Sequence, residues 1–244
     1  DDTVKDFRGI KKHLNAEPLG SIPFISEKKN LSKYNGYIVA SSFEAIWTKL
    51  NLQIKKGGPR SILITSFRYE GKSTTALHLA MNIAKSTSQK VLLIDANLRN
   101  PSLHCLLNMD NFFGLREILD GSLPVEQAIR ATELENLKVI TSGEIPYENP
   151  SGILESGRMD NLLSGLREKF DLIIIDSPAL DKYPDGAILS SRVDYTILLV
   201  EAMKTRYPVA RHAREMLDKN GAGSLGIILN KRRFYIPEKI YKRL

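Results

Sequence analysis

Short aliphatic runs that alternate with helical stretches limit most strongly what this chain can fold into. The six runs occupy residues 61–65, 91–94, 137–140, 172–175, 195–200 and 225–229, and helical spacing lies between them, for example at 73–85, 159–169 and 210–219. Strands that are aliphatic on both faces are buried in a sheet that helices cover from both sides. The pattern therefore predicts an α/β fold with a mainly parallel sheet and helices on both faces.

Length and composition fit one domain of this class. The chain has 244 residues, of which 42% are hydrophobic and 26% are charged, an ordinary balance for a globular protein. Cys105 is the single cysteine, which excludes an internal disulfide and a cysteine metal cluster. The longest aliphatic run has four residues, far fewer than the ~20 that a membrane-spanning helix needs.

The strand predicted at 61–65 leads into residues 66–74, SFRYEGKST, and then into a helix. A Gly-Lys-Ser-Thr sequence between a strand and a helix is typical of a phosphate-binding P-loop, although Ser66 stands where the strict pattern has its first glycine. Gly71 lets the backbone approach phosphate, Lys72 neutralises its charge, and the Ser73 hydroxyl coordinates Mg²⁺. We therefore predict a nucleotide site with magnesium at the contiguous residues Glu70, Gly71, Lys72, Ser73 and Thr74.

Two carboxylates and one amide follow other predicted strands. Asp95 and Asp176 end the second and the fourth strand, and ligands of open parallel sheets bind beyond the carboxyl ends of the strands. Either aspartate could therefore reach the magnesium shell, and a helix cap is the alternative for each. Asn230 ends the sixth strand, at the edge where related P-loop ATPases contact adenine, and a turn at the strand end is the alternative there.

The net charge of +7 is concentrated at the ends of the chain. Residues 1–60 and 231–244 each carry a net charge of +5, whereas residues 61–230 carry −3. With 7% aromatic residues and no recognition helix in the pattern, we expect no nucleic-acid partner, and an anionic membrane is the alternative. We expect residues 1–36 to form a linker or extended arm, 37–230 the P-loop domain, and 231–244 a basic tail that contains tyrosines.

Taken together, these segments resemble the bacterial tyrosine kinases, the cytoplasmic P-loop domains of polysaccharide co-polymerases in capsule and exopolysaccharide export. Residues 66–74, 91–101 and 173–178 resemble the Walker A, Walker A′ and Walker B motifs of that family. Residues 142–151 resemble its glycine/proline loop, and residues 19–23 resemble its juxtamembrane stretch. The resemblance covers about residues 18–230.

The resemblance implies a role for each matching residue. ATP and Mg²⁺ would be held by Lys72 and Ser73 with Thr74, Asp176 would organise the metal, and Asp95 would lie near the attacking tyrosine hydroxyl as a base or a ligand of the metal shell. All three motif residues Lys72, Asp95 and Asp176 would then be catalytic.

The resemblance also implies partners and a location. Tyr235 and Tyr241 would be the phosphoacceptors and would enter the site of a neighbouring copy, so a homo-oligomer is expected. The domain would lie on the cytoplasmic side of the bacterial inner membrane. Its partners would be a membrane-embedded part, on the same chain or on another, and the polysaccharide export machinery.

Several positions depart from the family pattern. Asn97 replaces the second Walker A′ aspartate, and an amide brings no charge and accepts no proton as a carboxylate does. Arg68 and Tyr69 replace the usual Pro-Gly of the loop. Trp47 and Leu50 replace the arginines that follow Glu44 in the family's oligomerisation helix.

These departures leave three functional hypotheses. The first is an active, ATP-dependent tyrosine autokinase that regulates polysaccharide synthesis and export. The second is a degenerate, catalytically impaired member that binds nucleotide and acts in regulation or assembly. The third is a P-loop ATPase of the partition and septum-positioning kind, which is disfavoured because Phe67 stands where those proteins carry an activating lysine.

Overall fold

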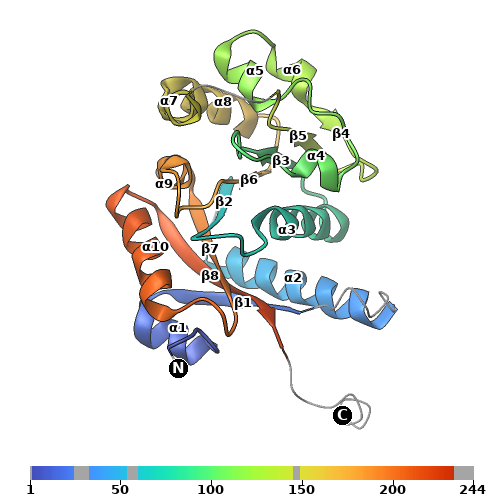
Figure 1. The fold of residues 1–244 in the computed structure, drawn as a ribbon. Coiled ribbons are helices and arrows are strands. Elements are labelled where there is room, and N and C mark those ends of the chain that lie inside the picture. Colours follow the sequence, from blue (N-terminus) through green and yellow to red (C-terminus); the bar gives the residue numbers. More distant parts are fainter. Residues whose placement is uncertain (1, 25–32, 54–59, 145–148, 234–244) are drawn as a thin grey trace.

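An eight-stranded sheet forms the centre of the fold in a computed structural model that describes residues 2–24, 33–53, 60–144 and 149–233 (Figure 1). Its strand order is β1-β8-β7-β2-β6-β3-β5-β4. The strands are β1 (Glu17–Pro23), β2 (Ser61–Ser66), β3 (Val91–Asp95), β4 (Arg130–Ala131), β5 (Leu137–Ile140), β6 (Leu172–Asp176), β7 (Tyr195–Glu201) and β8 (Ser224–Arg232). Only the pairing of β4 with β5 is antiparallel among these strands, which confirms the predicted fold class and all six predicted strands.

Helices cover both faces of this sheet (Figure 1). They are α1 (Phe7–Leu14), α2 (Lys33–Gln53), α3 (Lys72–Ser86), α4 (Leu103–Leu106), α5 (Leu115–Asp120), α6 (Val125–Ala128), α7 (Pro150–Glu155), α8 (Gly157–Arg167), α9 (Asp185–Ser190) and α10 (Tyr207–Lys219). Successive residues of β2 serve the two faces, since Ile62 and Ile64 pack beneath α2 and α3 whereas Leu63 packs in a second cluster with α5, α7 and α8. Among the described helices, none is both long and apolar enough to cross a bilayer.

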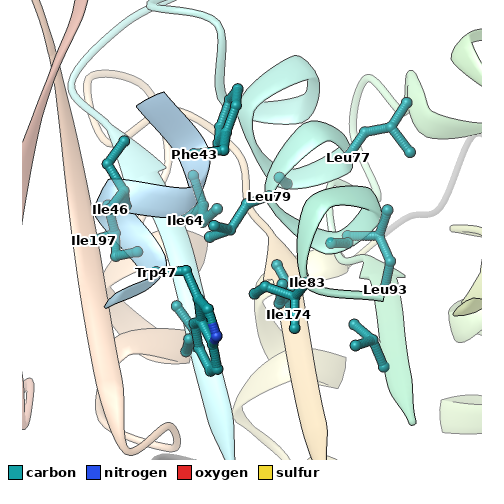
Figure 2. Close-up of a cluster of buried hydrophobic side chains, with 14 of the residues drawn as sticks. Phe43, Ile46, Trp47, Ile64, Leu77, Leu79, Ile83, Leu93, Ile174 and Ile197 are labelled. Carbon is teal, nitrogen blue, oxygen red and sulfur yellow. The ribbon is translucent and has the colours of Figure 1, made fainter. Parts of the chain in front are cut away.

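The layer between the sheet and the helices α2 and α3 holds two of the residues that depart from the family pattern. Figure 2 shows Trp47 in the same buried cluster as Phe43, Ile46 and the strand residue Ile64. Trp47 and Leu50 are buried, and burying a large apolar side chain contributes about 1.5–3 kcal/mol. These positions therefore stabilise the hydrophobic core between α2, α3 and the sheet.

The expectation that residues 1–36 form a linker is wrong for the part that the structure describes. Helix α1 is capped by the Asp6 carboxylate, which accepts a hydrogen bond from the Gly9 N–H at 2.8 Å. Strand β1 follows and pairs in parallel with β8 at the edge of the sheet. The prolines at 18 and 23 resemble linker composition, but an edge strand tolerates proline because one side of its backbone needs no partner.

Two predicted domain boundaries also fall inside elements. Helix α2 begins at Lys33 and crosses the boundary expected between residues 36 and 37. Strand β8 continues to Arg232, so the tail expected from residue 231 begins within the sheet. Residues 234–244, with Tyr235 and Tyr241, lie outside the described residues.

Candidate nucleotide-binding site

The loop between β2 and α3 has the geometry that phosphate binding needs. Gly71 has a φ of +90°, and a Cβ atom there would lie 2.8 Å from the Asn230 side-chain nitrogen, so glycine is required. Helix α3 has 15 residues and begins at the next residue, Lys72. The free N–H groups at its N-terminus favour anions. The loop and the helix together form an anion-binding cradle.

Lys72 is held by this loop. Its Nζ donates to the Ser66 hydroxyl and to the Arg68 carbonyl, both at 3.1 Å. The Ser66 hydroxyl donates to the same Arg68 carbonyl, so serine at the first glycine position takes part in the loop. Burial lowers the pKa of Lys72, and the negative charges of Asp176 and Glu70 oppose that shift. An incoming phosphate would replace the two uncharged acceptors of the ammonium group.

Asp95 and Asp176 lie opposite each other at the ends of β3 and β6, and both are fully buried. The Asp95 carboxylate accepts from the N–H groups of Asn97 at 3.1 Å, Ser102 at 3.2 Å and Leu103 at 3.1 Å. Asp95 thus accepts hydrogen bonds from backbone N–H groups at the start of α4, as the helix-cap alternative requires. It also lies beside the Asp176 carboxylate. Burial raises the pKa of Asp95 to about 6, and the three N–H groups oppose the shift.

Neither oxygen of the buried Asp176 carboxylate makes a hydrogen bond within the usual limits of distance and angle, although the Ser73 hydroxyl and the Ser177 N–H lie close enough to favour its charged form. Burial and the neighbouring Asp95 charge raise its pKa to about 8, although Ser73 and Lys72 oppose the shift. A buried carboxylate without well-formed hydrogen bonds is stabilised by a cation. The donor set of a carboxylate and the Ser73 hydroxyl fits Mg²⁺, which binds to one or two carboxylates and to substrate phosphates.

No group of three histidine, cysteine, aspartate or glutamate side chains in the described part of the chain could hold a metal by itself. A magnesium ion at Ser73 and Asp176 would therefore need phosphate oxygens and water to complete its shell. The site fits a metal that arrives with a nucleotide.

A cleft of about 530 Å³ opens at the nucleotide loop, with Lys72, Ser73 and Thr74 in its lining. The loop, the segment after β3 and the segment after β6 all line it, and its lining includes four cationic side chains, Lys72, Arg99, Lys182 and Lys231. Tyr69 is 67% exposed at its edge, with its ring 5.9 Å from the Lys72 ammonium and 5.8 Å from that of Lys182. The volume and the charge suit a polyphosphate.

Asn97 uses its amide in a local turn. Its Nδ2 donates to the Asn100 carbonyl at 2.6 Å, and its Oδ1 accepts from the Asn100 N–H at 3.1 Å. The amide thus fixes the shape of the segment after β3 and adds no charge to the cleft.

Glu70 was expected to contact nucleotide, and the structure places its side chain elsewhere. The carboxylate is 5% exposed and accepts a hydrogen bond from the Thr205 hydroxyl behind the loop. Its backbone carbonyl accepts from the Asn230 side chain at 2.6 Å. Only the backbone of Glu70 thus remains a predicted nucleotide contact.

Asn230 borders a second, smaller cavity of about 200 Å³, which Gly71 also lines. Thr74, Phe43 and His78 line that cavity as well. Contact of Asn230 with adenine stays a prediction, and its two hydrogen bonds to Glu70 and to the Lys231 N–H show that it also supports the loop.

The sequence did not point to a buried clamp beside the cleft. The Arg99 guanidinium bonds to both oxygens of Asp185, at 2.7 and 3.1 Å, and to the Ser151 hydroxyl at 2.8 Å. The Tyr183 ring lies 3.8 Å from the guanidinium carbon. These contacts join the segment after β3 to α7 and α9, and the bond to Asp185 raises the pKa of Arg99.

The fold and the site define a P-loop nucleotide-binding protein, and a family model described as an AAA domain matches residues 70–207. Tyrosine-protein kinase YwqD of Bacillus subtilis is 32% identical over 225 residues, which cover 92% of this chain and 91% of that protein. Tyrosine-protein kinase CpsD of Streptococcus agalactiae is 34% identical over 191 residues, or 78% of this chain and 82% of that protein. The chain belongs to the AAA-domain family and, within it, to the bacterial tyrosine-protein kinases.

Solved structures agree with this assignment. The kinase domain of the Escherichia coli tyrosine kinase ETK superposes with a TM-score of 0.86 at 25% identity, covering 96% of each chain. The septum site-determining protein MinD of Pyrococcus horikoshii, complexed with Mg-ADP, has a TM-score of 0.59 at 23% identity over 75% of this chain and 76% of that one. The MinD likeness shows the fold alone, and the partition and septum alternative is not better supported.

Proposed function

We propose that this chain is a protein-tyrosine kinase that transfers the γ-phosphoryl group of ATP to a tyrosine hydroxyl. The observation that carries the proposal is the buried Asp176 carboxylate beside Lys72 and Ser73, two residues that line a cationic cleft. A P-loop without such a carboxylate would bind phosphate but would lack a protein carboxylate to hold its metal. The family membership supplies the acceptor, since the curated relatives YwqD and CpsD are named tyrosine-protein kinases.

The residues of the loop would bind and orient the phosphates. Lys72 and the α3 N-terminus would neutralise the phosphate oxygens, and Ser73 with Asp176 would hold Mg²⁺. A bound magnesium ion supplies charge neutralisation for the transferred group. Phosphoryl transfer depends mostly on such positioning and charge, so each of these side chains is expected to matter.

In this proposal Asp95 receives the proton of the tyrosine hydroxyl. The tyrosine oxygen bonds to the γ-phosphorus, the bond from that phosphorus to the bridging oxygen of ADP breaks, and the tyrosine proton passes to the Asp95 carboxylate. A pKa near 6 suits a base that works near neutral pH. The three backbone N–H groups keep this carboxylate in place during the transfer.

Asn97 favours a second candidate function, that of an impaired kinase that binds nucleotide. Both polar atoms of its amide are used in the turn with Asn100, and this position, which lines the cleft, carries an amide where the family pattern has an aspartate. In the Asn97→Asp variant a carboxylate would return there. A rise in transfer rate of ten-fold or more would identify the amide as the cause of impairment.

We also propose a wider setting on the cytoplasmic side of a bacterial inner membrane, in polysaccharide synthesis and export. A membrane-embedded part and further copies of the chain would be its partners. The support is the family membership and the basic excess at both ends of the chain. The phosphoacceptors Tyr235 and Tyr241 belong to this proposal.

The test is phosphotyrosine formation by the full chain incubated with ATP and Mg²⁺, read by mass spectrometry. Wild type is expected to gain phosphotyrosine, and Lys72→Ala to gain none. Wild type that binds ATP but forms no phosphotyrosine, on itself or on an added tyrosine peptide, would establish the impaired candidate. A chain that binds no ATP would refute both.

A further inference from the structure

Thr205 connects two parts of the molecule that are remote in sequence. It follows β7 in the turn before α10 and is 8% exposed. Its hydroxyl donates to the Glu70 carboxylate and accepts from the Glu201 N–H at 3.1 Å. The hydroxyl is therefore fully used, and its donor function is directed at the nucleotide loop.

Glu70 depends on this hydroxyl. Its carboxylate is buried, and the other donor that the structure describes for it is the Arg68 N–H at 3.5 Å. The Asn230 side chain holds the Glu70 carbonyl from a second direction at 2.6 Å. Because Glu70 directly precedes Gly71 and Lys72, these two contacts fix the backbone that cradles phosphate.

The other side of Thr205 is held by the first residues of the chain. The Val4 N–H donates to the Thr205 carbonyl, and the Met203 N–H donates to the Val4 carbonyl, both at 2.8 Å. The Tyr207 N–H donates to the Asp2 carbonyl at 2.8 Å. Residues 2–4 thus form an added strip of backbone along the turn that carries Thr205.

Side chains reinforce this strip. Val4 is fully buried in the cluster beneath α10, and the Asp2 carboxylate pairs with the Arg206 guanidinium at 2.8 Å. Displacing residues 2–4 would therefore loosen the turn from both its apolar and its polar side. Contacts therefore run without a gap from Asp2, through the turn that carries Thr205, to Glu70, the residue before Gly71.

We infer that Thr205 is a positioning residue for the nucleotide loop, and that the segment of residues 2–4 acts on nucleotide affinity through it. The inference rests on the proposed function in one respect, namely that residues 66–74 bind nucleotide. The segment of residues 2–4 would then have a regulatory role and would not be a passive linker. Displacement of residues 2–4 would therefore change the affinity of the loop for phosphate.

The direct test compares three variants of the full chain by titration with a fluorescent ADP analogue and Mg²⁺. Thr205→Val removes the donor and leaves the Glu70 carboxylate buried, and we expect about ten-fold weaker binding. Thr205→Ser restores the hydroxyl and should bind within about two-fold of wild type. Thr196→Val is the matched control, because the Thr196 hydroxyl is buried in β7 without a partner.

A purely structural role for Thr205 would leave nucleotide affinity unchanged once the protein is folded. Thr205→Val that is folded at the assay temperature and binds the analogue as Thr196→Val does would therefore overturn the inference. Wild type that binds no nucleotide would instead refute the proposed function, so the two failures are distinguishable.

A second variant tests the N-terminal part and covers the case in which Thr205→Val does not fold. Arg206→Gln removes the exposed pair with Asp2 and leaves the Thr205 hydroxyl in place. We expect faster hydrogen exchange at residues 2–4 and at 68–71 together, with about two- to three-fold weaker binding of the analogue. Faster exchange at residues 2–4 alone, with unchanged binding, would overturn the coupling.

Discussion

Replacing Arg99 by glutamine is expected to destabilise the protein more than replacing its partner Asp185 by asparagine. The Asp185 side chain is completely buried, whereas the Arg99 side chain is 24% exposed. Loss of Arg99 leaves a carboxylate inside the protein with the Ser151 hydroxyl as its remaining side-chain partner. Loss of the Asp185 charge leaves a guanidinium that can turn toward the cleft and water.

The magnitudes follow from this asymmetry. Breaking a buried ion pair by removing one partner costs about 3–5 kcal/mol, and we expect Arg99→Gln near the lower end because its own side chain is partly hydrated. Asp185→Asn keeps an acceptor for the guanidinium and is expected to cost about 1–2 kcal/mol. Urea unfolding at pH 7, followed by circular dichroism, gives both free energies. Equal costs, or a larger cost for Asp185→Asn, would show that the burial of the Asp185 carboxylate does not set the difference.

Three further predictions concern the loop, the carboxylate pair and the basic end. Gly71→Ala is expected to weaken nucleotide binding at least ten-fold, whereas Gly157→Ala, where a Cβ meets open space, should bind as wild type in the same titration. Because the pKa of Asp176 in the folded protein is raised to about 8, the free energy of unfolding of the metal-free wild type should fall as pH rises from 5 to 8. Urea unfolding of Asp176→Asn should show a fall at least about 1 kcal/mol smaller. Equal falls in the two proteins would contradict the raised pKa. Replacing the exposed Lys5, Arg8 and Lys12 by glutamine should reduce the fraction of protein that sediments with anionic vesicles. Each basic residue near such a surface adds ~1 kcal/mol of attraction to it. An unchanged fraction would show that these three residues do not contribute.

The strands that the sequence predicts are those buried on both faces. Their aliphatic runs admit no other environment in a globular chain, and β2, β3 and β6 lie together at the centre of the sheet. Strand β1 was missed because Pro18, Gly20 and Pro23 give it the composition of a linker. Strand β4 has two residues, too few to form any pattern.

Some features of the site could likewise be predicted from the sequence, and others could not. The proximity of Asp95 and Asp176 could be predicted because each ends a strand, and parallel strands bring their ends to one edge. Lys72 and Ser73 could be placed at the same edge because they begin the helix that follows β2, and the binding roles of all four residues stay predictions. The direction of the Glu70 side chain could not, because its partner Thr205 is 135 residues away and is an ordinary threonine in sequence.

The clamp around Arg99 escaped prediction for a related reason. Arg99 and Asp185 are 86 residues apart, and the carboxylate stands at the start of a short helix, where an aspartate is usually a cap. Only the packing of α7 and α9 against the segment after β3 brings the three polar groups together. Spacing along the chain carries no signal for such a contact.

The most direct test of the account is the dependence of ATP binding on Mg²⁺, measured by calorimetry for wild type and for Asp176→Asn. The buried Asp176 carboxylate is the proposed partner of Ser73 in holding a metal that arrives with the nucleotide. Wild type should therefore bind ATP more tightly when Mg²⁺ is added, and Asp176→Asn should lose most of that gain while it still binds metal-free ATP. An equal gain in both proteins would contradict the account.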